Sequence, residues 1–368
     1  MKNQEIKFKD KLDSYSVFIG SNTLNILPHK IKKLCPKTKK IALIIDKKIP
    51  NKFKKILKSK LKDYNVFLFS FSSSEKMKSF KTVDYFLKAL LSKNFNRSDL
   101  VIGVGGGITG DVVSFVASIY KRGINFINIP TTLLAQVDSA IGGKTGVNSS
   151  YGKNLIGSFY QPKMVISDTE FLKSLPKREI VCGYGEILKH SLILNKVFYN
   201  YLKNNSLKII NLESPFIEKA ILESCKIKKA VVEKDEKEKN FRKILNFGHT
   251  FAHAFEAALG YSNKLNHGEA VILGMVTALK FSFDIRLIKF KEFNKILNDI
   301  QNTNLPFNIK SYFSLKDLNL ILNFMKKDKK NFSERINLIL LKKIGSAVID
   351  KEYNSIKIKK FLIKELVD

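Results

Sequence analysis

The sequence predicts an α/β fold in two parts, a mainly parallel sheet covered by helices followed by an all-helical domain. In the first half, short β-rich runs alternate with segments of helical length and period, the pattern of strand–helix–strand crossovers. After about residue 176, long apolar segments with helical period dominate. The length of 368 residues also exceeds what one core usually supports. We therefore expect domains at 1–176 and 177–368.

The expected strands follow one another in the first domain. Each is a short run rich in β-branched and aromatic residues, as strands favour, and they are 41–46, 65–71, 99–107, 125–130 and 164–168. Segments 83–95 and 111–123 have helical period and lie between strands. Helices on both faces of the sheet are the expected result.

The formal charge of +32 raises the question of nucleic-acid binding, because clustered cations release counterions from phosphate backbones. Only six of the 65 basic residues are arginine, however, and the lysines are spread along the whole chain. Base reading favours the bidentate arginine fork. We therefore interpret the charge as a solvated surface and expect no nucleic-acid partner.

No run approaches eighteen uninterrupted apolar residues, and the first twenty residues alternate charged and apolar side chains. Neither a membrane span nor an export signal is therefore expected. Cys35, Cys182 and Cys225 are odd in number and far apart, which argues against a disulfide framework. These features favour a cytoplasmic protein with reduced thiols.

The glycine-rich stretch GVGGGITGD follows an expected strand and opens an expected helix. Gly105, Gly107 and Gly110 satisfy the pattern G-x-G-x-x-G, which lets a backbone approach a pyrophosphate at a helix N-terminus. The usual acidic residue about twenty positions later is missing, and Asp46 at the end of an earlier strand is the alternative ribose partner. A glycine-rich turn without a ligand is the competing interpretation.

Residues 129–159 form a second cluster of polar side chains among five glycines. They contain Asp138, Lys144, Asn148, Lys153 and Asn154. Loops longer than about a dozen residues in compact domains are usually functional. We expect an irregular binding loop here, with a bare polar loop as the alternative.

Three of the five histidines lie within nineteen residues. His249 and His253 are four apart and share one face of an expected helix, and His267 follows. With Glu186 from GYGEILKH, His249 and His267 can supply the three ligands that a catalytic zinc ion commonly takes, leaving His253 to handle protons. Core histidines that satisfy each other are the alternative. We assign His29 and His190 to structure.

Together these segments resemble the 3-dehydroquinate synthase family, the cyclising enzymes of the shikimate pathway. The resemblance is carried by GGGITGD, IPTTLLAQVDSAIGGKTGVN, GKNLIGSF, GYGEILKH, RKILNFGHTFAHAFE and HGEAVILGM, in register from about residue 40 to 345. It implies an N-terminal Rossmann-like domain that binds NAD, a helical domain that binds a divalent metal, usually zinc and alternatively cobalt, and a homodimer.

The resemblance also implies the site residues. Its NAD contacts match Asp46, Glu75, Lys78, Gly106, Gly107, Asp111, Thr131 and Thr132, with Lys144 and Lys153 beside them, and its metal ligands match Glu186, His249 and His267. The implied catalytic and substrate-binding set is Asp138, Lys144, Lys153, Asn154, Lys189, Arg242, Asn246 and His253. Lys229 and Lys329 complete it, although neighbouring lysines offer other registers, and Arg122 resembles an arginine that reaches the partner subunit's site.

The implied substrate is 3-deoxy-D-arabino-heptulosonate 7-phosphate, which carries a carboxylate and a phosphate. In the implied reaction a ring hydroxyl is oxidised transiently, phosphate leaves by β-elimination, the hydride returns, and ring opening and aldol closure give 3-dehydroquinate. Asn154, Lys189 and Asn246 are assigned to the phosphate, and Lys144 and Arg242 to the carboxylate. Another sugar phosphate cyclase and a metal-dependent polyol dehydrogenase are the alternatives.

Overall fold

The computed structural model describes residues 4–9, 14–303, 305–327 and 335–367. The chain divides into two compact units. The first consists of Met1–Pro176 with Ile217–Lys229, and the second of Lys177–Phe216 with Ala230–Asp368.

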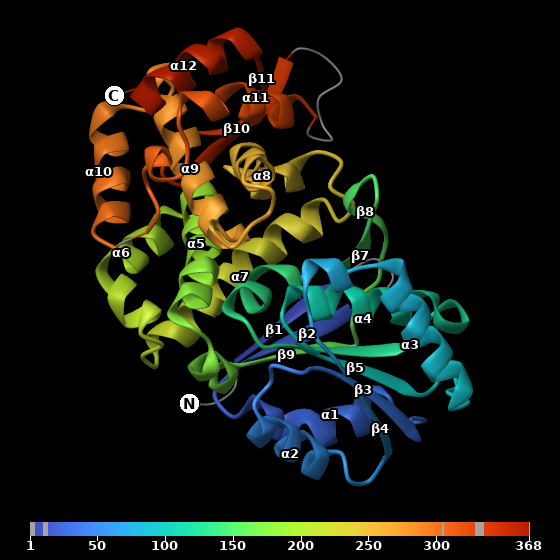
Figure 1. The fold of residues 1–368 in the computed structure, drawn as a ribbon. Helices are drawn as coiled ribbons and strands as arrows, with labels where there is room; N and C mark the ends of the chain where they lie inside the picture. The colour runs from blue at the N-terminus through green and yellow to red at the C-terminus, as the bar shows by residue number, and fades with distance from the viewer. Residues whose placement is uncertain (1–3, 10–13, 304, 328–334, 368) are drawn as a thin grey trace. The chain divides into compact units, whose positions relative to one another are not determined.

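The first unit is built on a seven-stranded sheet (Figure 1). Its strands in spatial order are β1 (Gln4–Lys9), β2 (Ser14–Gly20), β9 (Met164–Asp168), β6 (Asn125–Pro130), β5 (Leu100–Gly105), β3 (Lys40–Asp46) and β4 (Asn65–Phe71). All neighbours pair in parallel except β1, which runs antiparallel to β2. The predicted mainly parallel sheet is therefore confirmed, with β1 and β2 added beyond β9 and β1 at the edge.

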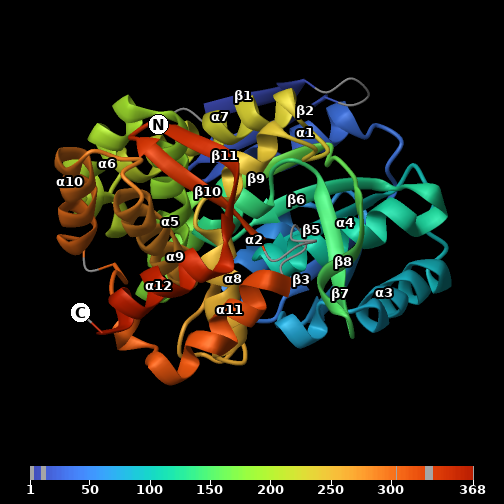
Figure 2. The same cartoon turned by 90° about the horizontal axis from the view of Figure 1, so that it is seen from above.

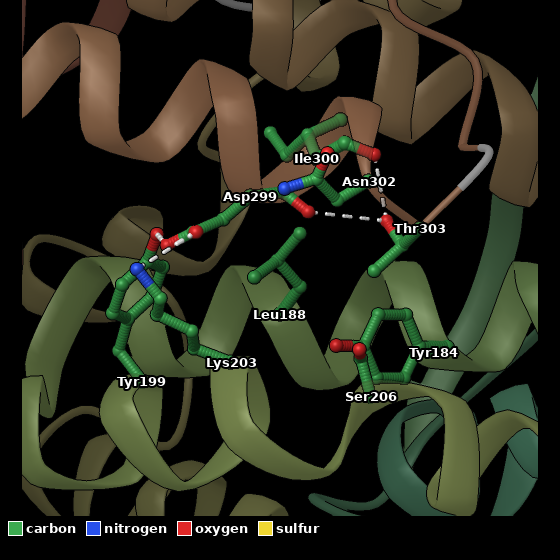
Figure 3. Close-up of a pocket in the computed structure, with 9 residues that line it drawn as sticks. All are labelled: Tyr184, Leu188, Tyr199, Lys203, Ser206, Asp299, Ile300, Asn302 and Thr303. Carbon is green, nitrogen blue, oxygen red and sulfur yellow. Dashed lines mark hydrogen bonds and ion pairs between the residues drawn. The ribbon is translucent and has the colours of Figure 1, made fainter.

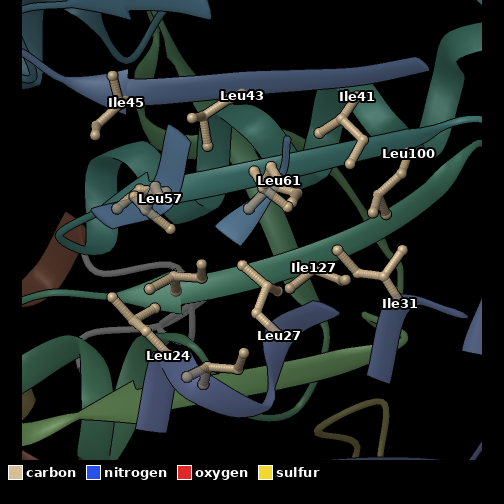
Figure 4. Packing of buried hydrophobic residues seen from close by; sticks show 14 of the residues in the cluster. Leu24, Leu27, Ile31, Ile41, Leu43, Ile45, Leu57, Leu61, Leu100 and Ile127 are labelled. Atoms are coloured by element: carbon tan, nitrogen blue, oxygen red, sulfur yellow. The ribbon is translucent and has the colours of Figure 1, made fainter. Parts of the chain in front are cut away.

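Both faces of this sheet are buried, which explains its nearly continuous apolar strands. On β3, Ile41, Leu43 and Ile45 point to one face, where they pack with residues of α1 (Leu27–Leu34) and α2 (Asn51–Lys60) (Figure 4). Ala42 and Ile44 point to the other face and pack with side chains of α3 (Phe80–Ser92) and α4 (Gly107–Ile119). The alternation follows from the two-residue period of a strand.

Helices and one hairpin complete the first unit. The longer helices are α1 (Leu27–Leu34), α2 (Asn51–Lys60), α3 (Phe80–Ser92) and α4 (Gly107–Ile119). Short helical turns lie at η1 (Thr23–Ile26), η2 (Glu75–Met77), η3 (Tyr120–Arg122), η4 (Ala135–Ser139) and η5 (Thr169–Ser174). The hairpin consists of β7 (Lys144–Ser149) and β8 (Gly152–Phe159).

This hairpin occupies part of the stretch that was expected to be an irregular loop. Gly146 and Gly157 face each other across the pair. A Cβ atom on Gly146 would lie 2.6 Å from Ile156 O, and one on Gly157 would lie 2.9 Å from Gly146 Cα. The glycines therefore allow two strands to approach closely instead of keeping the backbone irregular.

The chain does not divide at one point after Pro176, because residues 217–229 of helix α7 (Phe216–Lys234) belong to the first unit. Three contacts hold them there. Thr169 Oγ1 donates to Glu218 at 3.3 Å, the Cys225 thiol donates to Gln136 O at 3.4 Å, and Lys228 pairs with Asp138.

The second unit is mostly helical. Its helices are α5 (Lys177–Leu194), α6 (Lys196–Ile210), α8 (His249–Ala258), α9 (His267–Asp284), α10 (Phe290–Gln301), α11 (Leu318–Lys327) and α12 (Ser355–Val367), with short turns η6 (Phe241–Asn246), η7 (Ile309–Ser311) and η8 (Leu315–Asp317). An antiparallel hairpin, β10 (Arg335–Lys343) and β11 (Ser346–Asn354), adds a two-stranded sheet to the helical domain that was expected (Figure 2).

Among the described residues, no helix combines the length and the apolar character that a membrane span requires. Cys35, Cys182 and Cys225 are buried and form no disulfide, as the sequence predicts.

Candidate active site

The glycine-rich turn joins β5 to α4. Gly106 is the residue that caps α4, so the first free N–H groups of that helix lie at the end of a central strand, where anions bind readily. The glycines are also needed for packing, because a Cβ atom on Gly105 would lie 2.5 Å from Thr109 Cβ and one on Gly107 would lie 2.9 Å from Ser139 Oγ. Thr131 donates its N–H to Gly105 O at 2.9 Å.

Asp46 and the two threonines lie at the carboxyl ends of β3 and β6, the two strands that flank β5. Asp46 is the last residue of β3, is buried, and accepts hydrogen bonds from Lys48 N at 3.0 Å and from the Ser73 hydroxyl. Thr131 and Thr132 follow β6 directly. Ligands of open α/β sheets bind outside these strand ends. The NAD role of these residues remains a prediction that this placement supports.

A cluster of charged and amide side chains connects η2, α4 and the β7–β8 hairpin. The buried Lys78 ammonium lies 2.5 Å from Asp111 Oδ2 and donates to Asn154 Oδ1. Glu75 accepts from Asn148 Nδ2 at 2.7 Å and lies 3.9 Å from Lys153 Nζ. Burial raises the pKa of Asp111, and Lys78 opposes that shift.

The structure thus brings together Glu75, Lys78, Asp111 and Lys153 from the predicted NAD-binding set. Asn154, which was assigned to the substrate phosphate, lies in the same cluster. Lys144, at the start of β7, is exposed, and Arg122 is exposed at the end of η3.

Asp138 lies on η4 and pairs with Lys228 of α7. Lys228 is only 4% exposed, and its ammonium lies 2.6 Å from Asp138 Oδ1. Lys228 was not in the predicted set, although helical period could have indicated it, because Ile221, Cys225 and Lys228 share the buried face. The predicted Lys229 is the next residue and is half-buried, and its role stays a prediction.

Replacing Lys228 with methionine is expected to lower kcat/KM by about 100-fold, the order of the loss when a positioned charge is removed from a reacting site. Lys226→Met is the matched control, because it removes an exposed charge two residues away on the same helix. We expect it to stay within about threefold of wild type, since exposed charges contribute little. Equal losses in both variants would contradict the assignment of Lys228.

In the second unit, α5, α8 and α9 approach one another at glycines. A Cβ atom on Gly185 of α5 would lie 2.5 Å from Ile272 Cγ1, and one on Gly268 of α9 would lie 2.5 Å from Cys182 Cα. One on Gly274 of α9 would lie 2.8 Å from Ala252 N of α8. Close backbone packing therefore fixes the three helices that carry Glu186, His249 and His267.

Gly248, which caps α8, has φ +79 and no room for a side chain, because a Cβ atom would lie 2.6 Å from Met275 N. Gly260 has φ +62 but open space around it. Gly260→Ala should therefore cost only the left-handed strain of about 1 kcal/mol. Gly248→Ala should destabilise by about 2–4 kcal/mol, because overpacking adds to that strain. Urea unfolding of the two variants measures the difference, and equal free energies of unfolding would refute the close approach.

The three predicted metal ligands meet in this unit. Glu186 is 1% exposed, and its Oε1 lies 3.9 Å from His249 Nε2. The ring centroids of His249 and His267 are 6.1 Å apart. His253 lies one turn after His249, with its ring centroid 5.6 Å from that of His249 and 6.4 Å from that of His267. One carboxylate and three imidazoles are therefore neighbours.

The hydrogen bonds of two histidines suit a metal site. His249 Nδ1 lies 3.3 Å from Phe247 O, and His267 Nδ1 lies 3.0 Å from Glu256 Oε2. Both partners are acceptors, so each Nδ1 carries the proton and each Nε2 carries the lone pair that binds a metal. Burial, followed by the charges of Lys189, His253 and His267, lowers the pKa of His249 well below its usual value. A neutral imidazole is the form that a metal requires.

Lys189 and His190 lie beside Glu186 of this cluster, and the predicted Arg242 and Asn246 belong to the same unit. Lys189 is 1% exposed and forms a buried ion pair with Glu186, and His190, assigned to structure, has a ring nitrogen within 4.8 Å of a Glu186 carboxylate oxygen. Arg242 is 2% exposed and donates to Glu236 O, while Asn246 donates to Glu238 Oε1 at 2.7 Å. Lys329 lies outside the described residues.

The second unit also has a pocket of about 110 Å³ that contains none of the predicted site residues (Figure 3). Tyr184 and Leu188 of α5 line it, together with side chains of α6 and α10. Tyr199 Oη donates to Asp299 at 2.6 Å in its wall. On a helix, Tyr184 and Leu188 share one face while Glu186 projects from the opposite one, so the pocket is separate from the histidine cluster.

Comparison with known proteins identifies the family. Residues 68–182 match the family model of the 3-dehydroquinate synthase N-terminal domain, and residues 183–331 match that of the C-terminal domain. The 3-dehydroquinate synthase of Pelagibacter ubique is 56% identical over 362 residues and 98% of each chain. That of Alkaliphilus metalliredigens is 42% identical over 89% of this chain and 90% of its own.

A solved structure shares the fold over nearly the whole length. It is a crystal structure of 2-deoxy-scyllo-inosose synthase complexed with carbaglucose-6-phosphate, NAD+ and Co2+, with a TM-score of 0.88 and 26% identity over 99% of this chain and 100% of that one. This chain belongs to the 3-dehydroquinate synthase family.

Proposed function

We propose that the chain converts 3-deoxy-D-arabino-heptulosonate 7-phosphate into 3-dehydroquinate and orthophosphate, a phosphate-eliminating lyase reaction of the shikimate pathway toward chorismate and the aromatic amino acids. The observation that carries the proposal is the convergence of Glu186, His249 and His267 with His253 in the second unit. Membership of the family supplies the substrate.

NAD and one divalent cation are the proposed cofactors, and the similar 2-deoxy-scyllo-inosose synthase structure holds NAD+ and Co2+. The donor set fits a metal because it offers one carboxylate and two imidazoles. Oxygen and imidazole ligands suit zinc, so zinc is the proposed ion. The first unit would hold NAD at the N-terminus of α4, beside Asp46 and the cluster around Lys78.

When bound, NAD would accept a hydride from the carbon that bears the substrate hydroxyl and later return it, and the cation would polarise the oxygen on that carbon. The chain's own residues then bind both anionic ends of the substrate and move protons. Arg242 and Lys144 are proposed to hold the carboxylate, and Asn154, Lys189 and Asn246 the phosphate. His253 takes and returns protons at the substrate, because it is exposed beside the two histidine ligands.

Orthophosphate release tests this proposal directly. Purified protein is incubated with the heptulosonate phosphate, NAD and zinc while phosphate and the absorbance of NADH are both followed. Phosphate release without accumulation of NADH is expected. Steady NADH growth would indicate a polyol dehydrogenase, and turnover of a sugar phosphate that lacks the carboxylate would indicate another cyclase.

A homodimer is proposed, in which Arg122 reaches the site of the partner subunit. Arg122 is exposed at the end of η3. Exposed apolar side chains lie nearby on α4 and β8, namely Ile119, Leu155, Ile156 and Phe159, and Ser158 of β8 bonds to Ser118 of α4 at 2.8 Å. Exposed apolar side chains on neighbouring elements often mark a contact between subunits. A cytoplasmic location is proposed from the biosynthetic family and the reduced cysteines.

Arg122→Ala is expected to lower activity at least about tenfold, as loss of a charge-assisted contact does. Mixing it with the equally impaired His253→Ala should restore part of the activity, because a mixed dimer contains one site with both residues intact. Each variant mixed with itself is the control. No recovery after subunit exchange would refute the shared site.

A further inference from the structure

Glu256 contacts a predicted metal ligand without belonging to the predicted set. Its Oε2 lies 3.0 Å from His267 Nδ1. The Glu256 side chain is only 9% exposed, whereas that of His267 is 44% exposed. A buried carboxylate needs a polar partner, and this imidazole provides one.

The contact decides which nitrogen of His267 binds a metal. An ionised carboxylate can only accept hydrogen bonds, so Nδ1 is the donor and the lone pair is on Nε2. The negative charge also makes the imidazole more basic, which strengthens its bond to a cation. The ring is thereby held in one tautomer and one orientation.

Glu256 lies on the same face of α8 as His249 and His253, at positions i, i+4 and i+7. Helix α8 therefore carries one proposed ligand and also the group that orients another ligand on α9. The backbone of His267 is fixed separately, since Asn266 caps α9 in a reciprocal capping box with Glu269.

We propose that Glu256 is a positioning residue for the metal: it fixes the tautomer and the direction of His267 and so raises metal affinity. The inference rests on the proposed function, because it needs Glu186, His249 and His267 to bind the ion. Glu256 touches neither substrate nor metal in this account.

The test is the zinc affinity of Glu256→Gln, measured by competition with a chromophoric chelator. Loss of an orienting partner typically weakens metal affinity 10–100-fold, and about this loss is expected, while the melting temperature of the metal-free protein stays close to wild type. Glu365→Gln is the matched control, because Glu365 also pairs with a cation, Lys280 at 2.5 Å, in the same unit. It should bind zinc as wild type does.

The outcomes separate this inference from the proposed function. If wild type binds no stoichiometric zinc, the metal site itself is refuted. If wild type binds zinc, His267→Ala does not, and Glu256→Gln matches Glu365→Gln, then Glu256 has no positioning role. A lower melting temperature of the metal-free Glu256→Gln protein with unchanged zinc affinity would show a merely structural role.

Should Glu256→Gln fail to fold, Glu256→Asp gives the same comparison. It keeps the charge but withdraws the carboxylate by one methylene. The zinc affinity of Glu256→Asp is then expected to be lower than that of wild type and higher than that of His267→Ala. A zinc affinity equal to that of wild type would overturn the proposal.

Discussion

Replacing His267 with alanine is expected to abolish turnover and metal retention together. Loss of an orienting partner alone weakens metal affinity by about 10–100-fold. His267→Ala removes one of the three ligands themselves, so zinc affinity should fall further than that. A bound cation contributes several kcal/mol of stabilisation to the transition state, so the rate should fall on the order of 1,000-fold or more.

His29→Ala is the control for this variant. His29 is exposed on α1 of the first unit and has no part in the proposed chemistry. Metal content by elemental analysis and phosphate release should match wild type in His29→Ala and be lost in His267→Ala. Full activity of His267→Ala without bound metal would contradict the ligand assignment.

Replacing His253 with alanine should separate proton handling from metal binding. A positioned general acid or base typically contributes about 100-fold to 10,000-fold, and a loss of kcat in this range is expected with unchanged zinc content. His253 is exposed on α8, so the space left by the ring is accessible to small molecules.

Two measurements check this second expectation. Metal content should equal that of wild type, and added imidazole should restore part of the rate because it can occupy the space left by the ring. If His253→Ala loses the metal while His267→Ala keeps it, the roles of the two histidines have been exchanged.

Much of the first unit follows from local sequence. The runs 125–130 and 164–168 match β6 and β9, because strands buried on both faces are nearly continuous apolar segments. The run 65–71 matches the edge strand β4, which is rich in the aromatic and β-branched residues that strands favour. The edge strand β1 was not predicted. It alternates charged and apolar residues and pairs with β2, and such short runs are ambiguous until a partner strand is present.

The hairpin β7–β8 and the grouping of residues 217–229 show a second limit. Glycine between polar residues indicates a loop, but Gly146 opposite Gly157 is explained only when the two strands are paired. Likewise, the apolar period of α7 predicts a helix but not the unit against which it packs. The contact of Cys225 with Gln136 places it in the first unit.

The candidate site was predictable where chemistry restricts the residue type. The approach of Glu186, His249 and His267 could be expected because few other side chains supply such ligands. Glu256 was missed although its spacing from His249 places it on the same helix face, since its role depends on a contact with another helix. Lys228 was also missed, because its contact with Asp138 follows from the buried face of α7.

The central claim is that Glu186, His249 and His267 bind one divalent cation. X-ray absorption of the zinc-loaded protein tests it most directly, with Glu186→Gln and His249→Ala beside wild type. One zinc per chain with two imidazoles and one carboxylate is expected, and each variant should lose its own contribution or the metal. A sulfur ligand, or a spectrum that neither substitution changes, would contradict the account.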